Sequence, residues 1–185
     1  MSVVWLGKIT ASGSASSVEF TSISQSYNRL IIAGNFRGSS TSSSDVNNYD
    51  MEWTAAGIVS GNNYATTMWG TYGTIGTDPP ADNKWQIYGD GWIGKLRCAR
   101  SYNSADNMMS FYMEVHNYTS TDSSEKKGVF SFFGTLQTGS DDQLVKRTTG
   151  CAIDDAAIDS FKFQLPDASN YVSGSYWNLY GVLNS

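Results

Sequence analysis

The stretch that most constrains how this chain can fold is residues 157–182, where two apolar segments flank a cluster of turn-forming residues. From Phe161 onward, apolar and polar residues alternate, which is the period-two pattern of a half-buried strand. Pro166 then removes a backbone donor, and the residues up to Gly174 favour turns. Residues 176–182 resume with aromatic and β-branched types, which suit a pleated surface. The stretch therefore predicts two strands joined by a loop. Trp177 and Leu179 are expected to face the core, with Gly181 leaving room where the sheets approach.

The same patterning recurs along the chain. An alternating segment at 107–119 predicts a strand, and apolar runs at 3–9 and 29–36 predict two more. Residues 85–98 predict two strand pieces around the turn residues 89–91, which suit a tight hairpin or a bulge, and the acidic residues 138–145 predict a turn. Gly34 interrupts the run at 29–36 and indicates a bulge or a close backbone approach. In the 107–119 strand one face is predicted to be apolar and the other polar, made respectively of Met109, Phe111, Met113 and Val115, and of Ser110, Tyr112, Glu114 and His116.

Composition supports an all-β fold. Aromatic residues make up 14% of the 185 residues, charged residues only 16%, and glycine occurs 18 times. We expect roughly nine or ten short strands and no convincing helix, which favours an antiparallel β-sandwich. Residues 1–185 are therefore predicted to form a single domain, a jelly-roll-like sandwich. Strand count alone does not separate this arrangement from an immunoglobulin-like sandwich.

Two stretches are predicted to be long loops. Residues 37–48 are rich in serine and low in complexity, and residues 64–84 mix Gly, Thr and aromatic residues without a clear period. Large aromatics outside regular strands often anchor interfaces, so Trp69, Tyr72 and Trp85 are predicted interface residues. Packing in the protein core is the competing interpretation for these side chains.

Charge and hydropathy narrow the classes of partner. The formal net charge of −5 argues against nucleic acid, which requires a basic face. No run approaches the roughly 18 apolar residues of a membrane span. The first ten residues lack the features of a secretory signal, so the chain is expected to be made and left in a cytoplasm.

Metal and cofactor sites are not predicted. Cys98 and Cys151 match no metal-ligand spacing, and buried free thiols are the favoured interpretation, with their pairing left open. The acidic pairs at 141–142 and 154–155, together with Asp159, offer calcium ligands only weakly, because adjacent carboxylates are common in solvated turns.

Catalysis is not predicted either. A Ser-His-acid relay around His116 would need a nucleophile motif that this sequence lacks. A glycoside hydrolase would need two carboxylates across a cleft, and Glu19, Glu52 and Glu114 all fall on expected strands. Solvent-facing strand positions explain these glutamates better, so the chain is predicted not to be an enzyme.

Residues 157–182, which we call the closing unit, combine a strand, a loop and a final strand in a distinctive order. The residues concerned are Ile158, Phe161, Phe163, Leu165, Tyr171, Gly174-Ser175 and Leu179-Tyr180-Gly181-Val182, with Arg29–Ile32 and Gly61–Tyr64 upstream. This arrangement resembles that of virion proteins of tailed phages, especially cyanobacterial and marine phages. In those proteins an I-x-x-I-x-(I/L) strand, an F-x-x-G-S loop and a final x-L-Y-G-(I/V) strand close a β-sandwich, and an early strand and a G-x-x-Y segment lie upstream.

The resemblance implies a non-enzymatic virion structural protein. Within that class we expect a capsid decoration (cement) protein that bridges major capsid subunits and self-associates, with a trimer suggested by the local three-fold sites of capsids. Low charge and abundant aromatics suit such permanent interfaces. The alternative is a tail fibre or spike module that binds a receptor or a host glycan.

Overall fold

The computed structural model shows an all-β chain. It describes residues 1–39, 108–122, 124, 127–128, 156–165 and 170–183 in full, and the backbone alone of residues 50–56, 64–74, 86–88, 94–97, 129–137 and 142–152. These ranges contain twelve strands and no helix, and so no helix that could span a membrane. The strands are β1 (Ser2–Thr10), β2 (Ser17–Phe20), β3 (Arg29–Phe36), β4 (Asp50–Ala56), β5 (Tyr64–Thr74), β6 (Gln86–Tyr88), β7 (Gly94–Arg97), β8 (Met109–His116), β9 (Lys127–Gln137), β10 (Asp142–Ala152), β11 (Ser160–Gln164) and β12 (Tyr176–Leu183).

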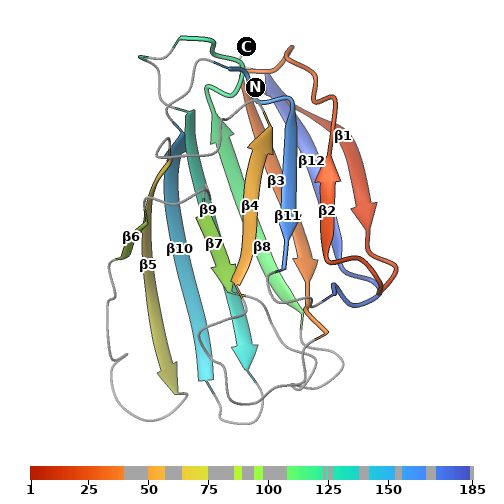
Figure 1. Cartoon of the computed structure of the whole chain (residues 1–185), viewed down its shortest axis with the longest axis vertical. Coiled ribbons are helices and arrows are strands. Elements are labelled where there is room, and N and C mark those ends of the chain that lie inside the picture. The colour runs from red at the N-terminus through yellow and green to blue at the C-terminus, as the bar shows by residue number, and fades with distance from the viewer. Residues whose placement is uncertain are drawn as a thin grey trace.

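The strands form two antiparallel sheets that lie face to face (Figure 1). The larger sheet has eight strands in the order β1-β12-β3-β8-β9-β10-β5-β6, and the smaller has four in the order β2-β11-β4-β7. The predicted all-β, antiparallel fold is confirmed. The jelly-roll arrangement stays a prediction.

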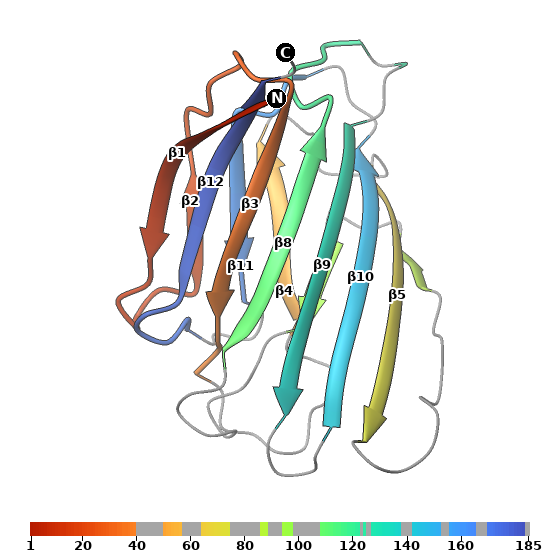
Figure 2. The ribbon, with the colours of Figure 1, turned by 180° about the vertical axis from the view of Figure 1, so that it is seen from behind.

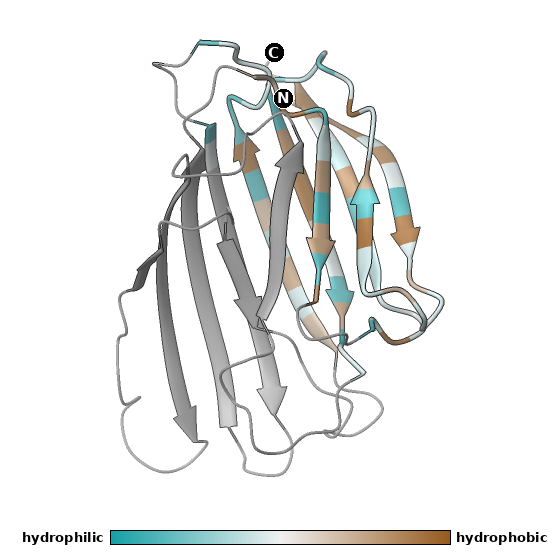
Figure 3. Cartoon of the chain, in the orientation of Figure 1, coloured by the Kyte–Doolittle hydropathy of each residue, from teal (hydrophilic) through white to brown (hydrophobic). Residues whose placement is uncertain are grey.

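Alternation along the strands explains which faces meet. In β8 the four predicted apolar residues are buried while Ser110, Tyr112 and His116 are exposed. Figure 3 shows this alternation as bands of brown and teal along β8, β2 and β11. The buried residues of the two sheets form one cluster. Its main members are Phe20, Leu30, Ile32, Phe36, Phe111, Met113, Val115, Phe161, Phe163, Tyr171, Trp177 and Leu179.

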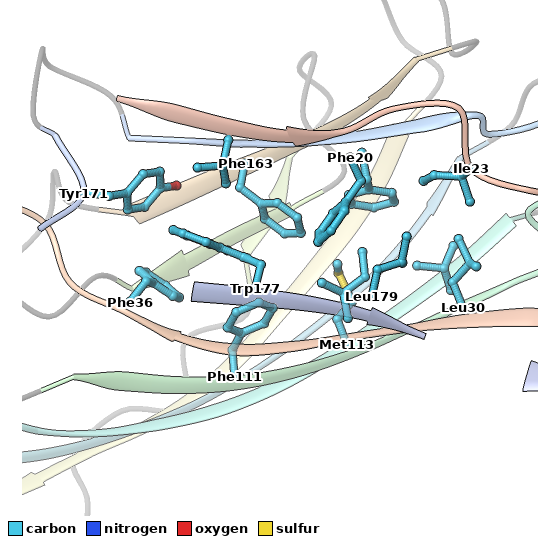
Figure 4. Packing of buried hydrophobic residues seen from close by; sticks show 14 of the residues in the cluster. Phe20, Ile23, Leu30, Phe36, Phe111, Met113, Phe163, Tyr171, Trp177 and Leu179 are labelled. Carbon is cyan, nitrogen blue, oxygen red and sulfur yellow. The ribbon is translucent and has the colours of Figure 1, made fainter. Parts of the chain in front are cut away.

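Trp177 on β12 joins the two sheets (Figure 4). Its fully buried ring stacks on Phe36 of β3 at 6.0 Å between centroids, and it lies 6.3 Å from Phe163 of the smaller sheet. Tyr171 meets it edge-on at 4.6 Å. Aromatic pairs of this kind contribute about 0.5–1.5 kcal/mol beyond the area they bury. The predicted burial of Trp177 and Leu179 is confirmed.

Two glycines allow close approaches beside these strands. A Cβ on Gly34 would lie 2.0 Å from the carbonyl oxygen of Tyr176, so the close approach predicted at Gly34 is confirmed. Gly181 was expected to give room between the sheets. Instead, a Cβ there would lie 2.4 Å from the ring of Tyr27, so the space at Gly181 is filled by a residue from the segment that precedes β3.

The prediction of a loop across 64–84 was wrong for residues 64–74, which form β5. Eleven consecutive residues of β5 pair with β10, from Tyr64 opposite Ala152 to Thr74 opposite Asp142. The repeated threonines favour an extended chain, and backbone pairing to β10 and β6 does not require alternating hydrophobicity. The expectation for residues 75–84 falls outside the described residues.

Other boundaries also differ from the sequence-based expectation. Residues 138–145 were expected to form an acidic turn, but β10 already begins at Asp142. The pieces β6 and β7 flank a predicted hairpin turn at residues 89–91, yet they pair with β5 and β4 in different sheets. The hairpin interpretation is therefore wrong. Of the predicted 37–48 loop, only residues 37–39 are described, and within them Gly38 forms an isolated bridge with Tyr171.

The Gly34 contact gives a direct test of how closely β3 and β12 approach. We expect Gly34→Ala to lower the free energy of unfolding by about 1–3 kcal/mol, because the added carbon overlaps the neighbouring backbone. Chemical denaturation measures this change. Gly128→Ala is the matched control, since its Cβ would meet nothing within 4 Å and should change stability by less than about 0.5 kcal/mol. Equal effects of the two substitutions would contradict the described packing.

Candidate functional site

The candidate site lies on the face of the eight-stranded sheet that points away from the smaller sheet, which we call the outer face. Figure 2 views the molecule from this side, with β1, β12, β3 and β8 next to one another. Strand register aligns their outward residues in rows. One row is Trp5, Tyr180, Ile31 and Glu114, and the neighbouring row is Val3, Val182, Arg29 and His116.

Exposed apolar side chains gather at the free edge of this sheet. We call Val3, Val4, Trp5 and Leu183 the edge patch. Trp5 is 61% exposed and Val3 52% exposed. Large apolar side chains gathered at one place on a surface often mark binding sites.

The strand that carries the edge patch is also unprotected. β1 is the last strand of its sheet and pairs only with β12 among the described residues. Natural edge strands are usually short, interrupted by proline or rich in charge. β1 has nine residues, no proline and one charged residue, Lys8. Its one irregularity is a β-bulge between Trp5 and Gly7, where Leu6 is the extra residue.

A polar cluster lies on the outer face, the side on which Val3 and Trp5 of the edge patch lie, whereas Val4 and Leu183 lie on the core side of the same edge. Its centre is the half-buried carboxylate of Glu114, which accepts hydrogen bonds from two side chains and lies beside a third. Arg29 Nη1 lies 3.2 Å from Glu114 Oε2, and His116 Nε2 lies 3.1 Å from the same oxygen. The hydroxyl of Tyr112 donates to Oε1. The cluster formed by Arg29, Tyr112, Glu114 and His116 therefore holds a carboxylate in a fixed position.

Arg29 links the cluster to the edge of the sheet. Its Nη2 lies 3.2 Å from the sulfur of Met1, directly before β1, while its Nη1 binds Glu114. Between the two regions, Tyr180 and Ile31 fill the row that connects Trp5 with Glu114. The edge patch and the polar cluster thus form one continuous surface with an apolar side and a polar side.

The other members of the cluster influence the ionisation of Tyr112. Burial raises the pKa of Tyr112 to about 12, and the hydrogen bond to Glu114 and its negative charge act in the same direction. Arg29 opposes this rise through its positive charge. Tyr112 is therefore a neutral donor at ordinary pH, held by a carboxylate that disfavours its ionisation.

The predicted interface residues lie elsewhere or outside the described part. Trp69 and Tyr72 belong to β5, opposite Arg147 and Leu144 of β10, where only the backbone is described. Trp85 falls outside the described residues. Their assignment to an interface stays a prediction.

Sequence reasoning missed Trp5, although a signal was present. Residues 3–6 are apolar on both faces of a strand, whereas a strand with one face in water alternates. A first strand that is apolar on both faces but lies at a sheet edge must expose part of its apolar surface.

Among the described residues that were weighed for catalysis or metal binding, Glu114 and His116 are in contact and the others lie elsewhere. His116 and Glu114 are in contact on the outer face as the sequence pattern predicted, and the cluster around them includes no serine or cysteine. Glu19 is exposed on β2 of the other sheet, and Glu52 pairs through its backbone with Gln164 in that sheet. In the fully described ranges, no three His, Cys, Asp or Glu side chains form a potential metal site.

The side chains of the two cysteines and of the acidic pairs lie outside the part of the chain that is described in full. Cys98, Asp141 and residues 154–155 fall outside the described residues, and Cys151 is described only through its backbone in β10. Asp159, which is described, is exposed in the segment before β11. The chain matches no protein-family model, and no curated protein matches it either.

The raised pKa of Tyr112 gives a pH test of the cluster. Because the folded pKa of about 12 exceeds the ordinary value of 10.0, the stabilising contribution is fully present below pH 10 and is lost as the pH rises towards 12. Burial also raises the pKa of Tyr118, so tyrosinate absorbance during alkaline titration should show more than one late-ionising tyrosine, of which Tyr112→Phe removes one. Glu114→Gln should lower the pKa of Tyr112, whereas Glu19→Gln on the other sheet should leave it unchanged.

Proposed function

We propose that this chain is a non-enzymatic assembly protein of a phage virion, a capsid decoration protein that attaches through the outer face near β1. The observation that carries the proposal is the edge patch, an exposed tryptophan and its apolar neighbours on an unprotected edge strand. A partner that covers this patch would remove apolar surface from water and satisfy free backbone groups.

Two features support protein binding at this place. Tryptophan is among the residues that most often dominate protein interfaces, and Trp5 is the most exposed aromatic among the described large hydrophobic residues. The polar cluster borders the patch, as a polar rim borders the apolar centre of many interfaces. The surface thus has the composition of an interface rather than that of a catalytic cleft.

The assignment to a virion comes from the closing unit. Its two strands are β11 and β12, which contribute Phe161, Phe163, Trp177 and Leu179 to the core. β12 also carries the half-buried Tyr180 on the outer face, beside Trp5 of β1. The sequence feature that resembles phage virion proteins therefore also supports the proposed attachment surface.

Virions are the direct test of the proposal. Mass spectrometry and cryo-microscopy of virions should find this chain in many copies on the head, in contact with the major capsid protein. A few copies at the tail tip would contradict decoration and favour receptor binding.

A reconstitution experiment tests the surface itself. Heads that lack this chain should bind the purified wild-type protein, and Trp5→Ala should weaken that binding by about tenfold or more, as for a central interface tryptophan. Lys162→Ala on β11 of the other sheet is the control and should bind like the wild type. Equal binding of both variants would place the attachment surface elsewhere.

Glycan binding is the second candidate, and one observation favours it. Trp5 and Tyr180 are neighbours on the outer face, and the side-chain amide of the half-buried Asn178 makes no hydrogen bond within the described part of the chain. An aromatic surface beside a free amide suits stacking and hydrogen bonding of a sugar. On this hypothesis, glycan arrays would show binding that both Trp5→Ala and Asn178→Ala abolish. The absence of binding to any host glycan would exclude it.

A further inference from the structure

The β-bulge makes β1 complementary to a second copy of itself. We propose that two copies of this chain associate through β1 in antiparallel pairing, about a two-fold axis that passes between Leu6 and Gly7. The two eight-stranded sheets then continue into one another. This inference rests on the proposed assembly function and names a second copy of the chain as the partner at the edge.

The argument starts from which side each residue of β1 faces. Its register with β12 aligns Val3, Trp5, Lys8 and Thr10 with Val182, Tyr180, Asn178 and Tyr176 on the outer face. Val4, Gly7 and Ile9 align with Gly181, Leu179 and Trp177 on the core side. Leu6, the extra residue of the bulge, packs against the core. The outward positions change from odd to even numbers at the bulge.

This change makes the pattern of outward positions, 3, 5, 8 and 10, symmetric about the point between Leu6 and Gly7. In a two-fold antiparallel pair centred between Leu6 and Gly7, Val3 lies opposite Thr10 of the second copy and Trp5 lies opposite Lys8. All four outward residues then face outward partners, since directly opposed residues share one side of a sheet. No other two-fold register of β1 pairs all four outward residues. A strand without the bulge would not have this property at this centre.

The opposed side chains also fit chemically. Lys8 is the one charged residue of β1, and Trp5 is its most exposed aromatic residue. Tryptophan is the best aromatic partner for a cation. Lys8 already lies over an aromatic ring in its own protomer, with Nζ 4.8 Å from the centroid of Tyr176. The two-fold register places each Lys8 beside Trp5 of the other copy, so the interface would contain this pair twice.

The core side of β1 is complementary as well. Val4 is 37% exposed and Ile9 is half-buried, although both face the apolar interior of the sandwich. In the proposed register Val4 lies opposite Ile9 of the second copy, and both would lose exposed surface. Gly7, next to the axis, would carry a Cβ with nothing within 4 Å on the core side of the strand, so no side chain crowds that position.

The free edge is also open to a partner strand. In Figures 1 and 2, β1 is the outermost strand at its end of the sheet, and no described segment lies beyond it. The backbone N–H and C=O groups of β1 that point away from β12, in the plane of the sheet, have no partner among the described residues. An isologous pair requires only this one surface, used twice.

The first test is the association state of the purified chain. Analytical ultracentrifugation should find a dimer at roughly tens of micromolar, a range typical of modest protein affinities. Lys8→Glu and Trp5→Ala should each raise the dimer dissociation constant by about tenfold or more, and Lys8→Arg should retain the dimer because arginine also binds aromatic faces. Lys162→Glu, an equal charge change on the other sheet, should have no effect.

The second test fixes the register. With Cys98 and Cys151 replaced by serine, a chain that carries Val3→Cys and Thr10→Cys should form a covalent dimer under mild oxidation, because opposed Cα atoms lie within disulfide reach. Each single variant should form far less. The pair Val3→Cys and Trp5→Cys reports the alternative register that places Val3 opposite Trp5. Thermal unfolding confirms that each variant is folded.

The outcomes separate the inference from the proposed function. A folded wild-type protein that stays monomeric, or cross-links only through residues 3 and 5, overturns the two-fold pairing. If that monomer still decorates heads through Trp5, the proposed function stands without it. If the chain dimerises as described but binds no heads, the inference stands and the proposed function fails.

Discussion

The structure depends on the packing of Trp177 between the two sheets. Its ring lies between the aromatic residues of β3 and those of the smaller sheet, and the strand that carries it pairs with β3 on one side and β1 on the other. Loss of this contact would therefore affect the core and the edge strand together. The outer face near β1 is positioned by the same strand, since the half-buried Asn178 and Tyr180 alternate with the buried residues of β12.

Much of the described core was predictable because burial on one face imposes a period of two. The inward residues of β8 and the burial of Trp177 and Leu179 followed from alternation alone. β5 was not predictable in this way. Its glycines and threonines show no period, and its strand conformation depends on β10, a partner that lies far away in sequence. The predicted hairpin of β6 and β7 was wrong for the same reason, because local turn chemistry does not specify which strands pair.

The candidate site was predictable only in part. The sequence placed His116 and Glu114 on one polar face, but it could not show that Arg29 reaches Glu114, since that contact depends on the register of β3 against β8. Trp5 looked like an ordinary core residue because hydropathy does not distinguish an edge strand from a central one. The order of strands in the sheet, which is a tertiary property, turns the same residue into exposed surface.

The pairing of β1 with β12 has a consequence for the timing of synthesis. Ser2 pairs with Leu183, so β1 leaves the ribosome long before residues 176–183, which form its sheet partner, have been made. Contacts between residues so distant in sequence form late, after the cost of closing a long chain segment has been met. A nascent chain therefore carries β1 without a sheet. Only a completed sandwich presents Trp5 and its neighbours in fixed register, which links association to the completion of folding.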